Sequence, residues 1–453
     1  MSKISRRTFL AGSAAALSLR SLARPASGLV STPKYPGMWP SEPPADGPLK
    51  RTSEFKGLDF TGRHQEYANA DTWYPSWASD DVQYSPFADG QVQDASGAKV
   101  LAACDKGPDA TTGLAKIVGN DPMQLQVTAI GNWKSSGMPY GGRYPCANLM
   151  LNGVWYYGTY CCDINLRRAN GVVYNWAWLG PFLGCRVSRD YGKTWTESPC
   201  KSWAPLFPED IGGKGAQLRA LEHHKEQMGG DEPGSDVGAL VSGLPLPKLG
   251  VMHFVDFGRN MQHSPDGKAY LVGHGAAPDA PHPRLGAVSW LSGDAVYLTR
   301  VALSTETVND ASQYEFFAGY DAHGAARWTR NFAEIMPMLE WKNHLGSVTV
   351  TYNPGLKKFL MCIADGWPST RMISTIVMEA DDVAGPWRMV TYLRDFGAQG
   401  YFVNIPSKFI QPDGKTFWLC YSANFTNSWL GTDYPIDPPG SRYGLCLQEV
   451  KLL

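Results

Sequence analysis

One hairpin plan returns five times along this chain of 453 residues, and this repetition constrains the fold more than any other feature. Each copy has an entering strand, a tight turn, an aromatic-rich second strand and a short polar exit. Three copies turn at Asn152-Gly153, Asp266-Gly267 and Asp413-Gly414, and such pairs between apolar runs are strong hairpin signals. The repeats predict an all-β, five-bladed β-propeller with inserted loops and one short helical insertion.

The repeats predict a single propeller domain over residues 29–453. Its units lie near residues 65–143, 144–204, 250–330, 340–395 and 400–453, with an insertion at 205–249. Inside the insertion, residues 216–228 are good helix formers between glycines and predict the helix. Two separate β-sandwiches are the alternative fold, but a sandwich does not predict the same hairpin five times.

The segment from Ser188 to Trp195 matches the Asp-box, Ser-x-Asp-x-Gly-x-Thr-Trp, at every defined position. In this motif we expect Asp190 to accept hydrogen bonds from backbone N–H groups of the turn. Gly192 should take a positive φ, and Trp195 should pack under the hairpin. We therefore assign Asp190 a structural role.

Residues 1–28 predict a twin-arginine export signal. Arg6 and Arg7 are followed by an apolar, Ala-rich stretch at 11–19, and small residues near 26–28 offer a cleavage point. The apolar stretch is shorter than the roughly 20 residues that a membrane-spanning helix needs. We therefore predict a periplasmic or secreted protein with no membrane span.

Charge and cysteine usage exclude some partners. Five of the 41 basic residues lie in residues 1–28, so the rest of the chain holds 36 basic and 42 acidic residues, a net charge of −6. This sign argues against a general nucleic-acid or polyanion binder. The nine Cys residues show no CxxC spacing and lie mostly in strand-like runs, so we expect few or no disulfides.

In a propeller, the first strand of each blade lines a central channel. The leading side chains of these strands should therefore meet near the axis, and they are Asp71, Cys146 or Asn148, His253 or Asp256, His344, and Asn404. This mixture of carboxylates, imidazoles and amides predicts a polar ligand site at the hub. In the insertion, His223 and His224 predict no metal site, because neither has a His partner four residues away.

The five-unit plan resembles the five-bladed propeller glycoside hydrolases of family 43 and their arabinan-active and uncharacterised relatives. The resembling segments are residues 70–77 with 84–90, residues 314–319 with Trp328, and residues 405–422. The resemblance implies an exported carbohydrate-active enzyme that acts on an oligosaccharide or polysaccharide. In family 43 an Asp that opens the first inner strand is the general base, and Asp71 occupies that position.

This chain departs from the family pattern in two blades. The family's second-blade Asp is replaced by Cys146 or Asn148, and its third-blade Glu has no direct counterpart. Hydrolysis of a glycosidic bond needs one protonated and one ionised carboxyl group. We therefore predict Asp71 as the base and Asp256 as the acid, with Glu315 in reserve.

The remaining candidates would hold the substrate or an ion. The family often places a His near a bound ion, and His344 is the candidate for that position; a Ca²⁺ ion at the axis would suit carboxylates on the loops. The candidates for binding a sugar are Trp73, Trp77, His253, Arg259, His274, Tyr401 and Asn404.

Two other functions stay open. A polysaccharide lyase needs a base and a cation that neutralises the uronate carboxylate. The residues of those types in the propeller region are His253, His263, His274, His344, Tyr270, Arg259, Arg300 and Arg330. A non-catalytic sugar-binding propeller is the third reading of the same sequence.

Overall fold

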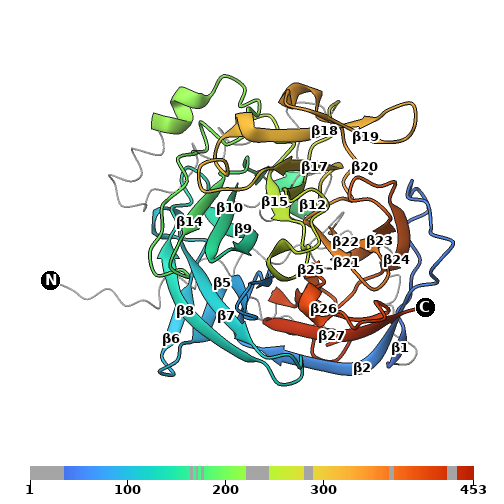
Figure 1. The fold of residues 1–453 in the computed structure, drawn as a ribbon. Helices are drawn as coiled ribbons and strands as arrows, with labels where there is room; N and C mark the ends of the chain where they lie inside the picture. Colours follow the sequence, from blue (N-terminus) through green and yellow to red (C-terminus); the bar gives the residue numbers. More distant parts are fainter. Residues whose placement is uncertain are drawn as a thin grey trace. The chain divides into compact units, whose positions relative to one another are not determined.

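The computed structural model describes residues 35–163, 167–169, 172–174, 178–220, 244–279, 289–366, 372–425 and 436–453. Within the unit Thr32–Leu453, five antiparallel sheets stand in chain order around a hub (Figure 1), which confirms the predicted five-bladed propeller. Residues 215–220 are helical, and the rest of the predicted helix lies outside the described residues. His223, His224 and the predicted export signal also lie outside them.

The first two blades come from residues 69–188. The inner edge of blade 1 is formed by β3 (Asn69–Asp71) and β4 (Ser76–Trp77), which both pair with β5 (Gln83–Gln93). Outside them lie β6 (Lys99–Ala102), β7 (Thr111–Val118) and β8 (Gln126–Lys134). Blade 2 contains β9 (Gly142–Leu151), β10 (Val154–Asp163), β13 (Trp178–Leu179) and β14 (Cys185–Ser188), and β11 (Arg167–Ala169) pairs separately with β12 (Val172–Tyr174).

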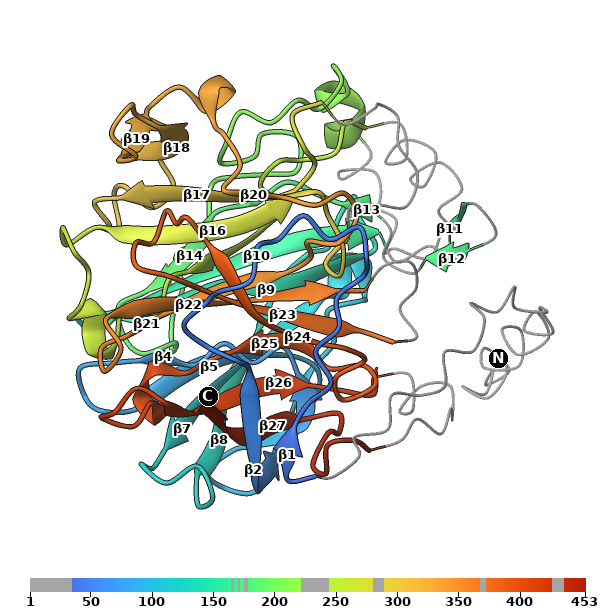
Figure 2. The same ribbon diagram turned by 90° about the vertical axis from the view of Figure 1, so that its right-hand side faces the viewer.

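Blades 3 and 4 are the most regular. Blade 3 contains β15 (Val251–Phe254), β16 (Ala269–Gly275), β17 (Ala295–Val301), β18 (Tyr314–Tyr320), β19 (Ala326–Thr329) and β20 (Leu339–Glu340). Blade 4 contains β21 (Val348–Asn353), β22 (Lys358–Asp365), β23 (Ser374–Ala380) and β24 (Arg388–Leu393). Figure 2 shows β18 and β19 at one edge of the molecule, beyond β17.

Blade 5 closes the ring with strands from both ends of the described chain. It contains β25 (Tyr401–Asn404), β26 (Thr416–Ser422) and β27 (Leu445–Leu452), and then β2 (Leu58–Tyr67) and β1 (Gly37–Met38). The pairing of β2 with β27 joins residues almost 400 positions apart, for example Leu58 with Leu452. The sequence repeats did not indicate this strand, because β2 precedes the first hairpin and has no copy of its own.

Short 3-10 helices connect several of these strands. They are η2 (Gly107–Asp109), η3 (Arg259–Met261), η4 (Ala311–Gln313), η5 (Phe332–Glu334) and η6 (Ser407–Phe409).

Local sequence explains the hairpins. At the first turn of blade 2, Asn152 has a φ of 51° and Gly153 a φ of 78°, and two successive positive values define the turn that best matches strand twist. The strands in the middle of each blade are buried on both faces because neighbouring blades cover them; every residue of β16, β22 and β23 is buried. This packing explains the near-continuous apolar runs that the sequence shows there.

In the turn that follows Ser188, the Asp190 carboxylate is hydrogen-bonded to residues of the same turn. Asp190 accepts hydrogen bonds from the Thr194 backbone (2.9 Å) and hydroxyl (2.6 Å), and Gly192 has a φ of 87°. Trp195 packs on Trp155, with ring centroids 5.5 Å apart. Asp190 therefore acts within its own turn.

The inner strands run in one direction along the hub. The isolated bridge between Asp256 and Thr351 is parallel, and it shows that the inner segments of blades 3 and 4 share this direction. We call the end of the hub at which the inner strands begin, near Asp71, the upper end, and the end at which they finish, near Trp77, the lower end.

Candidate functional site

Two aspartates meet at the upper end of the hub. Asp71 is the last residue of β3 and lies opposite Ala88 of β5, next to Asp89. The hairpin of β4 and β5 pairs Trp77 with Gln83, and continuing that register would place Asp71 opposite Asp89. An extra residue in the segment between β3 and β4 shifts the pairing by one, and a bulge in β5 restores the register at Asn69 and Gln91. Both side chains line one pocket.

Unusual backbone conformations shape this corner. Thr72 and Asp89 have φ values of 64° and 34°, which residues other than glycine rarely adopt. Gly90 lies against β3 so closely that an added Cβ would sit 2.2 Å from the carbonyl oxygen of Asn69. A glycine at this position is therefore what permits β3 and β5 to approach where the two aspartates lie.

Asp71 is buried and holds two hydrogen bonds. The Tyr401 hydroxyl donates to its Oδ2 (2.7 Å), and the Thr72 hydroxyl donates to its Oδ1 (3.1 Å). Burial outweighs these bonds and raises the pKa of Asp71 to about 6. Tyr401 comes from β25, so blades 1 and 5 together set the properties of this carboxyl.

Asp89 shares the pocket and titrates with Asp71. The backbone N–H of Cys104 donates to its Oδ1 (2.6 Å). Burial, and next the charge of Asp71, raise the pKa of Asp89 well above its ordinary value. Two neighbouring carboxyl groups in a poorly solvated site resist ionising together. The arrangement therefore favours one ionised group, Asp71, beside one protonated group, Asp89.

Aromatic rings form the walls around the pair. They come from strands of blades 2 and 5 and from loops within blades 3 and 5, and they are Tyr144, Tyr160, Trp290, Tyr401, Phe402 and Phe425. Trp290 is central in this wall, with its ring 5.3 Å from that of Tyr401 and 5.0 Å from that of Phe402. The enclosed space is about 30 Å³, which holds water but no sugar ring. A sugar would reach the aspartates only after part of this wall moves.

The polar ring predicted at the hub is present, but it is used to join the blades. Asn148 donates to the carbonyl oxygens of Tyr74 (2.6 Å) and Tyr84 (2.8 Å), and Asn404 donates to that of Trp73 (2.9 Å). Likewise, the hydroxyl of Thr349 donates to the Val403 carbonyl (2.9 Å). These side chains satisfy backbone groups of a neighbouring inner strand.

The imidazoles near the axis are buried and neutral. His253 contacts the hydroxyl of Ser347 (3.2 Å), and burial lowers its pKa to about 3. His274 contacts the carbonyl oxygen of Ser289 (2.7 Å), and burial lowers its pKa to about 4. Neither lines the pocket of Asp71.

His344 belongs to a separate cluster on blade 4. Its Nδ1 lies 2.8 Å from Oδ2 of Asp365, and the Tyr392 hydroxyl donates to the same oxygen (2.8 Å). Its ring stacks on Trp341 at 4.3 Å. The structure therefore orients this imidazole firmly, but it does not place it among the residues that line the aspartate pocket.

Three candidates lie at the lower end of the hub, away from Asp71. Asp256 accepts hydrogen bonds from the backbone (2.9 Å) and hydroxyl (2.7 Å) of Ser407 and from the backbone of Gly258 (2.9 Å). Trp77 donates to Asp81 (2.8 Å), and Arg259 donates to the carbonyl oxygen of Ser79. The structure does not bring the predicted acid, Asp256, to the predicted base; this carboxylate instead ties blade 3 to blade 5.

Glu315 lies far out on blade 3. It belongs to β18, the fourth strand from the hub, and pairs with Lys268 (2.6 Å) and Arg300 (2.6 Å). Burial opposes ionisation here, but the two cations hold its pKa below the ordinary value. The reserve acid is therefore not at the axis either. Trp73, which we expected to stack on a sugar, is buried against Phe87 (5.8 Å) below the pocket wall.

The set proposed for a lyase is also dispersed. Arg259 lies at the lower end, while Arg300 is on an outer strand, where it covers Trp328 at 3.9 Å. In the described residues, no three His, Cys, Asp or Glu side chains are placed together to hold a metal ion. Within the same residues, no helix has the length and apolar character to cross a membrane. Cys104, Cys146, Cys185, Cys362, Cys420 and Cys446 are buried within the described strands and loops.

Sequence reasoning found Asp71 and Tyr401 but missed Asp89 and most of the aromatic wall. Asp89 could have been found from the hairpin. Counting outward from the turn between Trp77 and Gln83 brings Asp89 opposite Asp71, one residue from the observed partner, Ala88. No such count finds Trp290 or Phe425, because they lie on loops within blades 3 and 5, outside the repeated hairpin.

The class of protein that the fold defines is a five-bladed β-propeller with an enclosed acidic pocket at one end of the hub. Among solved structures, the chain is similar to an α-L-arabinofuranosidase from Podospora anserina in complex with cellotriose, at 11% identity and a TM-score of 0.37, covering 92% of this chain and 97% of that one. It is also similar to a GH43_1 enzyme from Xanthomonas citri, at 12% identity and a TM-score of 0.40, covering 86% and 90%. An endo-arabinase from Bacteroides thetaiotaomicron aligns at 9% identity and a TM-score of 0.39, covering 86% and 94%. No protein-family model and no curated protein sequence matches the chain.

Proposed function

We propose that this protein is an exported glycoside hydrolase whose acid and base are Asp89 and Asp71. The observation that supports this proposal is a pair of coupled carboxyl groups, Asp71 buried and Asp89 half-buried, in a pocket with aromatic walls. Glycosidic bond hydrolysis needs one protonated and one ionised carboxyl group near the bond. Environments that push two pKa values apart supply that division at one pH.

The roles follow from the two environments. Asp71 accepts hydrogen bonds from two hydroxyl groups, which favour its ionised form, and it takes a proton from water, so that the water oxygen bonds to the anomeric carbon. Asp89 gives its proton to the departing glycosidic oxygen as the bond between that oxygen and the anomeric carbon breaks. Transfer of the proton from Asp71 back to Asp89 restores the starting state. Both protons are thus accounted for within the pair.

The aromatic wall supports a sugar as the substrate. Tyrosine and tryptophan offer flat apolar faces with a polar edge, which suits the alternating apolar faces and hydroxyl groups of a sugar ring. Because the enclosed space is about 30 Å³, binding must displace wall residues such as Trp290 or Phe425. Ca²⁺ has no part in this proposal, since the two carboxyl groups supply both proton transfers.

The test is a panel of neutral and uronate-rich polysaccharides, followed both as new reducing ends and as ultraviolet absorbance. We expect reducing ends without the absorbance that a lyase product gives. Asp71→Asn and Asp89→Asn should each lower kcat by about 10²–10⁴-fold. Glu315→Gln is the matched control, and its kcat should equal that of the parent protein. Full activity of Asp89→Asn would overturn the proposal, and absorbance without hydrolysis would favour a lyase.

A further inference from the structure

A second pocket lies away from the two aspartates, between the insertion and blade 3. Its volume is about 720 Å³, within the range of roughly 300–1,000 Å³ typical of ligand sites. One wall comes from the insertion, at residues 208–210 and 245–248, and the other comes from residues 311–316 and 330–333 of blade 3. It shares no lining residue with the pocket of Asp71.

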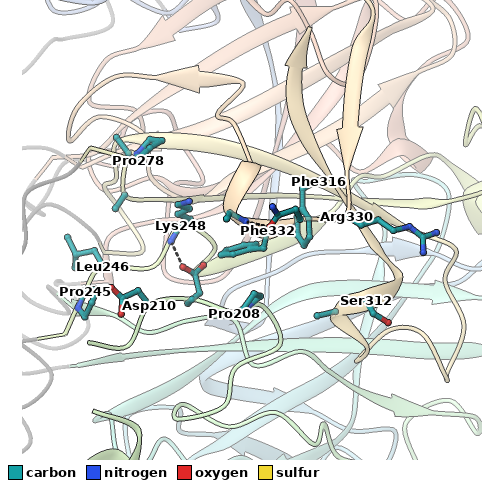
Figure 3. A pocket seen from close by; sticks show the side chains of 16 residues that line it. Pro208, Asp210, Pro245, Leu246, Lys248, Pro278, Ser312, Phe316, Arg330 and Phe332 are labelled. Atoms are coloured by element: carbon teal, nitrogen blue, oxygen red, sulfur yellow. Dashed lines mark hydrogen bonds between the residues drawn. The ribbon is translucent and has the colours of Figure 1, made fainter. Parts of the chain in front are cut away.

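The carboxylates in this pocket are engaged by backbone. Glu209 accepts hydrogen bonds from the N–H groups of Lys248 (3.1 Å) and Leu249 (2.8 Å), the first of which is drawn in Figure 3. Burial raises the pKa of Glu209 to about 7, so near neutral pH much of its charge is absent. Asp210 accepts from the backbone of Gly212 (2.7 Å). Both acidic groups therefore brace the insertion.

The cations have no equivalent partners. Lys248 places its ammonium group 5.5 Å from the ring centre of Phe332. Among the described residues, neither Lys248 nor Arg330 has a carboxylate oxygen within salt-bridge distance, 4.0 Å. Figure 3 shows Phe332 between these two side chains in the pocket. Lys248 and Arg330 therefore line the pocket without an ion-pair partner among the described residues, beside the carboxyl groups of Glu209 and Asp210.

A rigid aromatic surface lies between the cations. Phe332 stacks in parallel on Phe207, with ring centroids 5.9 Å apart and an interplanar angle of 4°, and meets Phe316 edge-on at 5.3 Å. Phe316 and Phe332 both line the pocket, and both are buried. An apolar surface flanked by two cations suits a carboxylate-bearing ring with an apolar face better than a small inorganic anion.

We infer that this pocket is a second binding site, for an acidic oligosaccharide whose uronate carboxylates pair with Lys248 and Arg330. The sugar class rests on the proposed function, whereas the charge and size come from the pocket itself. A site outside the hub would hold a chain of the substrate while its bonds are cleaved at the aspartates. Arg330 would donate two parallel hydrogen bonds to the carboxylate, a geometry that its planar guanidinium provides.

The test is binding of a galacturonate trimer to the full chain by calorimetry, with Asp71→Asn present throughout to prevent turnover. We expect the trimer to bind and maltotriose, a neutral trimer, to bind at least about tenfold more weakly. The double variant Lys248→Gln with Arg330→Gln should weaken galacturonate binding at least about tenfold. Lys193→Gln with Lys415→Gln removes the same charge from exposed positions elsewhere and should leave the affinity unchanged.

Three outcomes would overturn this inference. The first is that the protein binds maltotriose as tightly as the galacturonate trimer. The second is that the Lys248 and Arg330 double variant binds the galacturonate trimer as tightly as the parent. The third is that inorganic phosphate at the same concentration displaces the galacturonate trimer. None of these requires turnover, so they are independent of the roles of Asp71 and Asp89. Loss of activity in the Asp71 and Asp89 variants without trimer binding would support the hydrolase and reject only the second site.

Discussion

At the scale of single residues, the ionised form of Asp71, which the proposed chemistry needs, reduces the stability of the fold. Its pKa is raised from 3.8 to about 6, so the folded protein binds this proton more tightly than the unfolded chain does. The protonated Asp71 carboxyl therefore makes its full contribution to stability below about pH 4, and this contribution is lost as the pH rises through about 6. At one and a third kcal/mol per pKa unit, the loss is on the order of 3 kcal/mol.

The first prediction uses this loss. Asp71→Asn should abolish activity and yet raise the free energy of unfolding at pH 7.5, by up to about 3 kcal/mol. The gain should shrink toward zero as the pH falls to about 4. Denaturant unfolding at several pH values measures both. A variant less stable than the parent at pH 7.5 would show that the carboxylate supports the fold, and the proposed role would lose its basis.

The second prediction concerns Tyr401, which donates to Asp71. Tyr401→Phe keeps the aromatic packing against Trp290 and Phe425 but removes a hydrogen bond that favours the ionised carboxyl. The pKa of Asp71 should rise further, so the acidic limb of the pH profile of kcat should move to higher pH. A lower kcat with an unmoved limb would indicate that Tyr401 acts on the substrate and not through Asp71.

At the scale of elements, the site depends on how closely the paired strands β3 and β5 approach each other. An added Cβ at Gly90 would lie 2.2 Å from the backbone oxygen of Asn69 and 2.6 Å from the Cα of Ala70, and backbone atoms cannot swing aside as a side chain can. Gly131 in β8 of the same blade has nothing within 4 Å of the equivalent position. The two glycines therefore form a matched pair.

The third prediction follows from this pair. Gly90→Ala should lower the free energy of unfolding by about 2 kcal/mol or more and reduce kcat, because separating the two strands moves Asp71 away from Asp89. Gly131→Ala should change stability by no more than about 0.5–1 kcal/mol and leave kcat unchanged. Thermal unfolding and initial rates provide the comparison. Equal effects of the two substitutions would mean that the close approach of β3 and β5 does not determine the positions of Asp71 and Asp89.

The elements also show what a sequence can and cannot predict here. The conformation of a turn such as Asn152-Gly153 depends on the two turn residues themselves, so the hairpins and the number of blades could be predicted. Asp71 could be found because it lies at the start of the first repeated hairpin. Asp256 does not reach Asp71, because it follows the end of β15 and so lies at the lower end of the hub. Trp290 could not be found, because its place depends on contacts with residues more than 100 positions away.

At the scale of the whole molecule, a strand from before the first hairpin completes the fifth blade. Phe60 of β2 is 1% exposed, and its ring packs on Trp39 and Phe396, each with centroids 5.7 Å apart. Its cluster joins the N-terminal segment to blades 4 and 5, with members such as Val377 and Leu419. The closure therefore rests on apolar packing as well as on the strand pairing of β2 with β27.

The last prediction tests whether this closure stabilises the whole ring. Phe60→Ala should cost about 3–5 kcal/mol, as deletions of buried aromatic rings do, and it should lower the temperature of a single unfolding transition. Leu101→Ala, at a position 58% exposed on β6, is the control and should change stability by less than about 0.5 kcal/mol. Calorimetry distinguishes the two ways in which the ring could fail. If Phe60→Ala instead produced a separate early transition, blade 5 would open on its own, and the other four blades would not depend on the closing strand for their stability.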